Sequence, residues 1–124
     1  KMTTHRSSID DFTLGYIECA LWSSLDDNGY PLDQHNDIDD IAESCLLSMI
    51  ADCAKFQADN RLMLAASGLD ASQQGHDFWL TRNHHGAGFW DHGLGQIGDI
   101  LTAAAHSFGE CGLYIGDDWE IHCE

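Results

Sequence analysis

The longest amphipathic pattern of the sequence lies between residues 37 and 67, and it constrains the fold more than any other feature. Apolar side chains recur there at the spacing that places them on one face of an α-helix: Ile38, Ile41, Ala42, Cys45, Met49, Cys53 and Phe56. Asp37 followed by Asp40 is typical of the capping arrangement at a helix start. The pattern predicts a helix from about residue 38 that either continues to Ser67 or breaks near Asn60, and that ends before Gly68.

Three further segments are predicted helices: residues 9–23, a helix that begins near Ala71 and includes Arg82 but whose end the pattern does not fix, and residues 94–108. Ser8 and Asp70 stand at the positions of N-caps for the first two of them. A glycine directly follows the third segment, where it can end a helix in the left-handed conformation.

The C-terminal segment carries the signal of a β-hairpin. Residues 113–115 and 119–121 are rich in apolar and aromatic side chains and flank a Gly-Asp-Asp turn. A lone hairpin is marginally stable, so we expect it to pack on the helices or to pair with another strand, for which residues 87–90 are a candidate. Residues 26–37 contain an Asn-Gly pair and the only proline, and are predicted to form a loop.

These elements predict an α+β protein that is mainly helical, with about four helices and a C-terminal β-hairpin. A chain of 124 residues with 44% hydrophobic residues can bury one ordinary core, so residues 1–124 are predicted to form a single domain. Met2 is the expected natural start, and no export signal or membrane-spanning stretch is recognised. We therefore expect a soluble protein of the cytoplasm.

The chain is strongly acidic, with 21 Asp and Glu residues against five Lys and Arg residues and a formal net charge of −16. This balance excludes a non-specific nucleic-acid binder, because few cations are present to neutralise phosphates. It also disfavours an anionic membrane surface as a partner. A basic protein surface that holds DNA or RNA would attract the chain. The alternative is that the charge only confers solubility.

Several acidic residues cluster in and after the predicted loop, and these are the candidate partner contacts: Asp26, Asp27, Asp33, Asp37, Asp39 and Asp40. If they share one face with Asp10 and Asp11, their carboxylates could imitate the phosphates of a nucleic-acid backbone. The alternative is that they serve as helix caps and turn residues.

The five cysteines form no CxxC pair and are odd in number, so no disulfide scaffold is expected. Cys45 and Cys53 lie on the predicted apolar stripe, where a free cysteine behaves as a small hydrophobe. This pattern predicts buried thiols and a reducing compartment.

The densest group of chemically capable side chains lies between residues 76 and 92, and its candidate site residues are His76, Asp77, Arg82, His85 and Asp91. Imidazole and carboxylate suit zinc, iron or manganese, and His84 and His92 are further possible ligands. The spacing matches neither HExxH, paired CxxC nor an EF-hand loop.

A second interpretation of this segment is structural. Arg82 would then pair with Asp77 or Asp91, within an aromatic core made of Phe78, Trp79, Phe89 and Trp90. No GxSxG nucleophile elbow or phosphate-binding loop is present, so the sequence assigns no catalytic residue and no cofactor.

Residues 76–92 read His-Asp-Phe-Trp-Leu-Thr-Arg-Asn-His-His-Gly-Ala-Gly-Phe-Trp-Asp-His. Together with residues 93–95, Asp99, residues 101–105 and 114–118, and residues 16–24 of the first predicted helix, this segment resembles a family of small acidic proteins encoded by phages, prophages and conjugative plasmids. Residues 29–72 carry little of the resemblance. That family has no established activity, so the resemblance implies a genomic setting, in which small acidic proteins often disarm host defences as anti-CRISPR or anti-restriction proteins do.

Three functions therefore follow as hypotheses. The first is an inhibitory binding protein that acts in the bacterial host cytoplasm, where it docks on the basic nucleic-acid-binding surface of a defence complex, without direct contact to nucleic acid or membrane. The second is a metal-dependent nuclease or phosphoesterase centred on the histidine-rich segment. The third is a phage structural or regulatory protein that assembles with itself.

Overall fold

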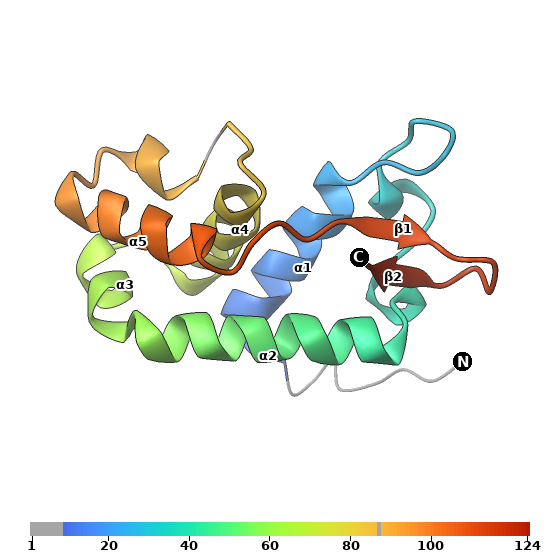
Figure 1. Cartoon of the computed structure of the whole chain (residues 1–124), viewed down its shortest axis with the longest axis horizontal. Coiled ribbons are helices and arrows are strands. Elements are labelled where there is room, and N and C mark those ends of the chain that lie inside the picture. The colour runs from blue at the N-terminus through green and yellow to red at the C-terminus, as the bar shows by residue number, and fades with distance from the viewer. Residues whose placement is uncertain (1–8, 87) are drawn as a thin grey trace.

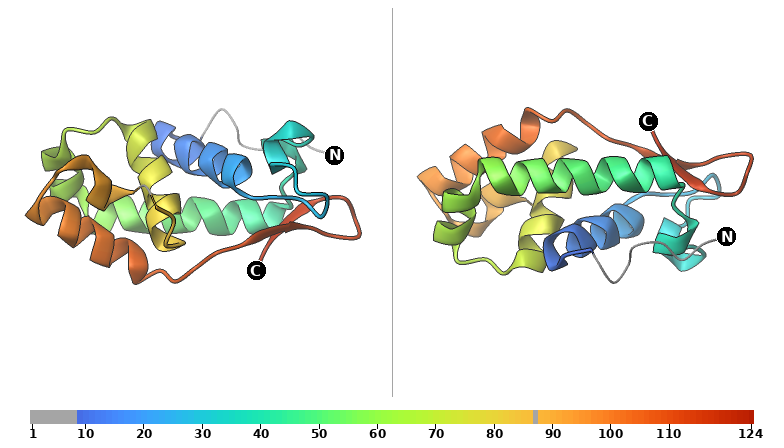
Figure 2. Two further views of the ribbon diagram at one scale, coloured as in Figure 1. Left: turned by 90° about the horizontal axis from the view of Figure 1, so that it is seen from above. Right: turned by 90° about the horizontal axis from the view of Figure 1, so that it is seen from below.

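The computed structural model describes residues 9–86 and 88–124 of the chain. In chain order, with η for a short 3-10 helix, its elements are α1 (Asp11–Ser23), η2 (Leu32–Gln34), η3 (Ile38–Asp40), α2 (Glu43–Asp59), α3 (Arg61–Ser67), α4 (Ala71–Arg82), η4 (Phe89–His92), α5 (Gln96–His106), β1 (Leu113–Ile115) and β2 (Ile121–Cys123). The long helix α2 lies along one side (Figure 1). Figure 2 shows α3, η4 and α5 at one end of the molecule, and η2, η3 and the hairpin at the other.

The predicted fold class is confirmed, because the described residues form five α-helices and a C-terminal antiparallel pair of strands. None of these helices is both long enough and apolar enough to cross a membrane. The fifth helix arises because the second predicted helix is divided: α2 ends at a cap on Asn60 and α3 follows directly. Of the two predicted alternatives, a continuous helix to Ser67 or a break near Asn60, the break occurs.

The core lies between α1, α2 and α4 and is rich in aromatic rings. Phe56 of α2 stacks on Phe78 of α4 with 4.2 Å between ring centroids, and Tyr16 of α1 lies 5.2 Å from Phe78. Helices α1 and α4 approach closely because Gly75 has no side chain: a Cβ there would overlap the backbone carbonyl of Phe12. This contact fixes α4, and with it the start of the histidine-rich segment.

The apolar stripe that begins at Ile38 is not one helix, which corrects the predicted start. Residues 38–40 form η3, and α2 begins only at Glu43. The backbone between them pairs with the hairpin: Ala42 N–H donates to the carbonyl of Ile121 at 2.8 Å. That donor is taken by a tertiary contact, so a continuous helix cannot form through this point.

The predicted caps are mostly confirmed. Asp37 and Asp40 form the expected capping box, but they do so around η3. Asp70 caps α4 by accepting from Gln73 N–H at 2.8 Å. The predicted cap at Ser8 lies outside the described residues, and Asp10 caps α1.

The hairpin is confirmed, with its second strand later than predicted. Tyr114 pairs with His122, and β2 begins at Ile121 because Trp119 lies in the turn. Residues 88–90 do not supply a third strand, since η4 begins at Phe89, and residue 87 lies outside the described part. Instead the hairpin contacts α2 through β2, and the side chains of Leu113 and Ile121 are buried in the common core.

One cysteine prediction is wrong. Cys45 of α2 and Cys123 of β2 form a disulfide across 78 residues of sequence, so Cys45 is not a free thiol. The pairing has no local signal, because it depends on the hairpin folding back onto α2. Cys53 and Cys19 are buried free thiols, and burial raises the pKa of Cys19 to about 12. These two thiols are therefore unreactive core residues.

Candidate interaction surface

Arg82 is a buried structural residue, with a side chain only 5% exposed. Its guanidinium donates to Asp52 Oδ2 at 2.9 Å, to the Tyr16 hydroxyl at 3.0 Å, and to the backbone carbonyls of Gly109 and Phe108. The expected ion pair with Asp77 or Asp91 is thus replaced by one with Asp52, which lies on α2. Arg82 joins α4, α1, α2 and the segment that follows α5, and it is not available to a ligand.

Asp77 is the other buried charge of the segment, with 2% of its side chain exposed. Its Oδ1 accepts from the Gln73 amide at 3.0 Å, and its Oδ2 lies 2.7 Å from His92 Nε2 with no other polar partner in the described residues. Burial raises the pKa of Asp77, although the bond from Gln73 and the charge of His92 oppose the rise. The pair ties η4 to α4.

The remaining candidates of this segment do not converge. His76 is half-buried on α4, whereas His85 is exposed in the segment after α4 and Asp91 is exposed on η4. No three of the described His, Cys, Asp and Glu ligand atoms between residues 76 and 92 lie within 4.8 Å of one another. Phe78, Trp79 and Phe89 are buried as the structural interpretation expects, while Trp90 is exposed.

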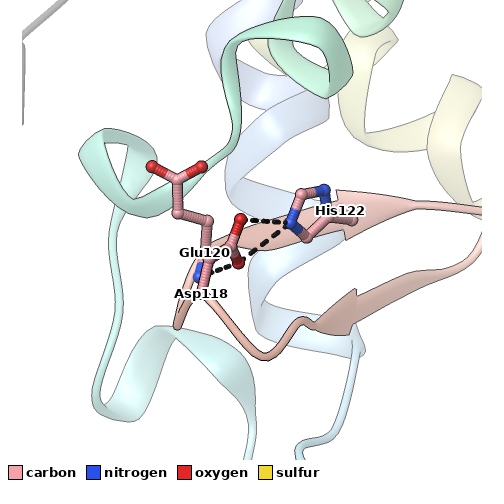
Figure 3. Close-up of side chains that lie close together, drawn as sticks. All are labelled: Asp118, Glu120 and His122. Carbon is pink, nitrogen blue, oxygen red and sulfur yellow. Dashed lines mark hydrogen bonds and ion pairs between the residues drawn. The ribbon is translucent and has the colours of Figure 1, made fainter.

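A three-residue grouping of metal-ligand type occurs instead at the hairpin, where ligand atoms of Asp118, Glu120 and His122 lie within 4.8 Å of one another. Figure 3 shows the Asp118 carboxylate facing the imidazole of His122, and both of its oxygens lie 3.0 Å from Nε2. Asp118 also accepts from Glu120 N–H at 2.9 Å. This bond and the imidazole lower the pKa of Asp118. The contacts account for the grouping as a turn-stabilising pair.

The six predicted contact residues all lie in the segment between α1 and α2. Half of them also hold the local backbone: Asp26 Oδ1 accepts from Asn28 and Tyr30 N–H, and Asp37 and Asp40 cap η3. The side chains of the other half, Asp27, Asp33 and Asp39, take no part in these bonds.

This segment and the hairpin lie at the same end of the molecule (Figures 1 and 2). We call residues 24–42 and 113–124 together the acidic end; they contain ten of the 21 acidic residues of the chain. The basic residues of the described part, Lys55, Arg61 and Arg82, lie on α2, α3 and α4 and not in this region. Asp10 does not join it, because its carboxylate contacts Gln57 late in α2.

Trp119 projects from the acidic end and was not singled out by sequence. It occupies a left-handed backbone conformation with φ 65°, and its residue surface is 82% exposed. Its N–H donates to Gly116 O while Gly116 N–H donates to Glu120 O, the pattern of a hairpin turn whose left-handed residue is usually glycine. Residues in rare backbone conformations cluster at functional sites, and Trp is enriched among the energetically dominant residues of interfaces, so Trp119 is a candidate contact residue. Tyr114 and Tyr30 are also half-exposed at this end.

Compared with known proteins, the chain matches no family model, no curated protein and no solved structure. The geometry of the acidic end is therefore the basis for assigning a function.

Proposed function

We propose that the protein is an inhibitory binding protein of a phage or mobile element, which docks its acidic end on the basic nucleic-acid-binding surface of a host defence complex. The observation that carries the proposal is the gathering of ten acidic residues in one region without a described Lys or Arg side chain. Such a region attracts a basic groove and competes with DNA or RNA for it.

The exposed aromatic side chains support a protein partner. Trp119, Tyr114 and Tyr30 lie among the carboxylates. Interfaces with proteins are enriched in Trp and Tyr, which contribute much of the binding energy, whereas charge alone contributes mainly to approach and specificity. The acidic end thus combines carboxylates that attract a basic partner with exposed aromatic side chains that can bury surface against it.

The test uses a host that carries a restriction or CRISPR system and measures the plating efficiency of a targeted phage. Charge reversal by Asp27→Lys with Asp33→Lys should reduce the protection given by the protein about ten-fold or more, because two attractive charges become repulsive. These side chains are exposed and hold no turn, so the fold should persist.

The matched control is Asp91→Lys with Asp99→Lys, which changes the net charge equally at the opposite end on η4 and α5. It should leave protection intact, and thermal unfolding should show that both double variants are folded. Capture of the host complex on immobilised protein should weaken as salt rises. If the Asp27 and Asp33 reversal leaves protection unchanged, the proposal is wrong.

A further inference from the structure

The outer edge of β1 is a free strand edge in the described part of the chain. Glu124 N–H donates to Gly112 O at 2.9 Å, and Gly116 N–H donates to Glu120 O at 2.8 Å, so the backbone groups of these glycines face β2. Successive strand residues point their backbone groups in alternate directions. Leu113 and Ile115 therefore point theirs outward, and no hydrogen bond from another described segment reaches them.

Two adjoining hollows lie along this edge, and we call them together the trough. The first, of about 330 Å³, is bordered on the strand side by Glu110, Cys111, Gly112 and Leu113. The second, of about 380 Å³, is bordered on the strand side by Tyr114, Ile115, Gly116, Asp117 and Trp119. Leu25, which is exposed, lines both, so one wall of the trough is the chain that leaves α1.

Acidic and apolar residues both line the trough. Carboxylates line it at four positions, Asp26, Asp27, Glu110 and Asp117, and no Lys or Arg of residues 9–86 and 88–124 lines either hollow. Its apolar side chains include the exposed Leu25, the half-buried Ile115 and the exposed rings of Tyr114 and Trp119. His85, one of the residues singled out by sequence, lies on the wall of the first hollow.

We propose that the trough binds an extended, basic segment of a partner protein, which adds to β1 as a third strand. Outward N–H and C=O groups of Leu113 and Ile115 would supply main-chain hydrogen bonds, the usual source of affinity in strand addition. Alternating Lys or Arg side chains would meet the carboxylates, and the intervening apolar side chains would meet Leu25, Ile115 and the exposed rings. The inference rests on the proposed function, because that proposal is the reason to expect a protein as the partner.

The probe is a fluorescent octapeptide of alternating lysine and valine, with binding to the whole protein followed by fluorescence anisotropy. The wild-type protein should bind it, and a glutamate–valine octapeptide should not bind. Two further octapeptides carry N-methyl groups on the odd or on the even residues. One of them should bind at least about five-fold more weakly than the other, because the methyl groups remove backbone N–H donors that pair with β1 in only one of the two peptides. Equal affinity of the two peptides would show that the backbone does not pair.

Variants at β1 separate the backbone contact from packing. Ile115→Pro removes an N–H that the hairpin does not use, whereas Ile115→Ala keeps it and loses a similar apolar contact. The proline variant should bind the lysine–valine peptide about five-fold more weakly than the alanine variant. Circular dichroism should show that both variants are folded. If the proline variant is unfolded, the comparison of the two N-methylated peptides still decides whether the backbone pairs.

The charge and the anchor are tested separately. Asp27→Asn with Asp117→Asn should weaken peptide binding, while Asp91→Asn with Asp99→Asn should not. Trp119→Gly should weaken binding yet raise the midpoint of thermal unfolding, because glycine adopts the left-handed conformation without strain. If the wild-type protein fails to bind the lysine–valine peptide while reversal of Asp27 and Asp33 still abolishes protection, the strand-addition inference fails alone and the proposed function stands.

Discussion

At the scale of single residues, the histidine-rich segment uses its two buried charges to build the fold. Arg82 donates to four acceptors from different parts of the chain, and Asp77 accepts from Gln73 and contacts His92. The sequence predicted that Arg82 would pair with Asp77 or Asp91, and both partners were wrong, because Arg82 pairs with Asp52. Asp52 is 30 residues away, and neither composition nor spacing relates the two positions.

The titration of the Asp77 carboxyl should make the stability of the protein depend on pH. Its pKa is raised in the fold, mainly by burial, so between the ordinary value of 3.8 and the raised value the folded state binds more protons than the unfolded state. Stability from this group therefore falls as the pH rises through that window. Asp77→Asn removes the titration, so its stability relative to the wild-type protein should increase from acid to neutral pH, as measured by urea unfolding.

A control at the partner residue sharpens this prediction. His92→Gln leaves the carboxylate buried and removes a contact that lowers its pKa, so the fall in stability with rising pH should persist. A constant difference between Asp77→Asn and the wild-type protein across the acid range would contradict the argument.

At the scale of elements, helical periodicity is enough to predict which segments are helical, and tertiary contacts decide where they begin. Ile38 and Ile41 fit the stripe of α2, but the pairing of Ala42 and Ile121 ends the helix before it reaches them. The turn at Trp119 is likewise not predictable from the local sequence pattern. A tryptophan in a hydrophobic run indicates a strand, and its left-handed conformation follows only from the closed turn. The carboxylates of the candidate surface were predictable, whereas its free edge and trough were not.

The contact between α1 and α4 gives a prediction whose sign opposes helix propensity. Alanine is favoured over glycine inside a helix by up to about 1 kcal/mol. At Gly75, however, an added Cβ would overlap the carbonyl of Phe12, which belongs to the rigid backbone of α1. Gly75→Ala should therefore destabilise the protein by about 1–3 kcal/mol in urea unfolding. Gly86→Ala, where a Cβ meets no atom, should change stability by less than about 0.5 kcal/mol, and an unchanged Gly75→Ala would contradict the close contact.

At the scale of the whole molecule, charge is distributed unevenly between the two ends. The acidic end concentrates like charges, and their mutual repulsion opposes the packing of the hairpin against η3 and α2. The buried side chains of Leu113 and Ile121, the hydrogen bond to Ala42 and the disulfide act against that repulsion. The disulfide ties the hairpin half of the acidic end to α2, which directly follows the other half.

Reduction of the Cys45–Cys123 bond should test what this link contributes. The bond closes 78 residues of chain, for which the entropy of the unfolded state predicts a stabilisation of at most about 4–5 kcal/mol. The reduced protein should unfold at a lower temperature, and added salt should restore part of the loss by screening the repulsion. Cys45→Ala with Cys123→Ala should behave like the reduced protein and should no longer respond to reductant.

In hydrogen exchange of the reduced protein, the hairpin amides should lose protection before those of α1 and α4. If reduction changes neither the unfolding temperature nor hairpin exchange, packing alone holds the acidic end together.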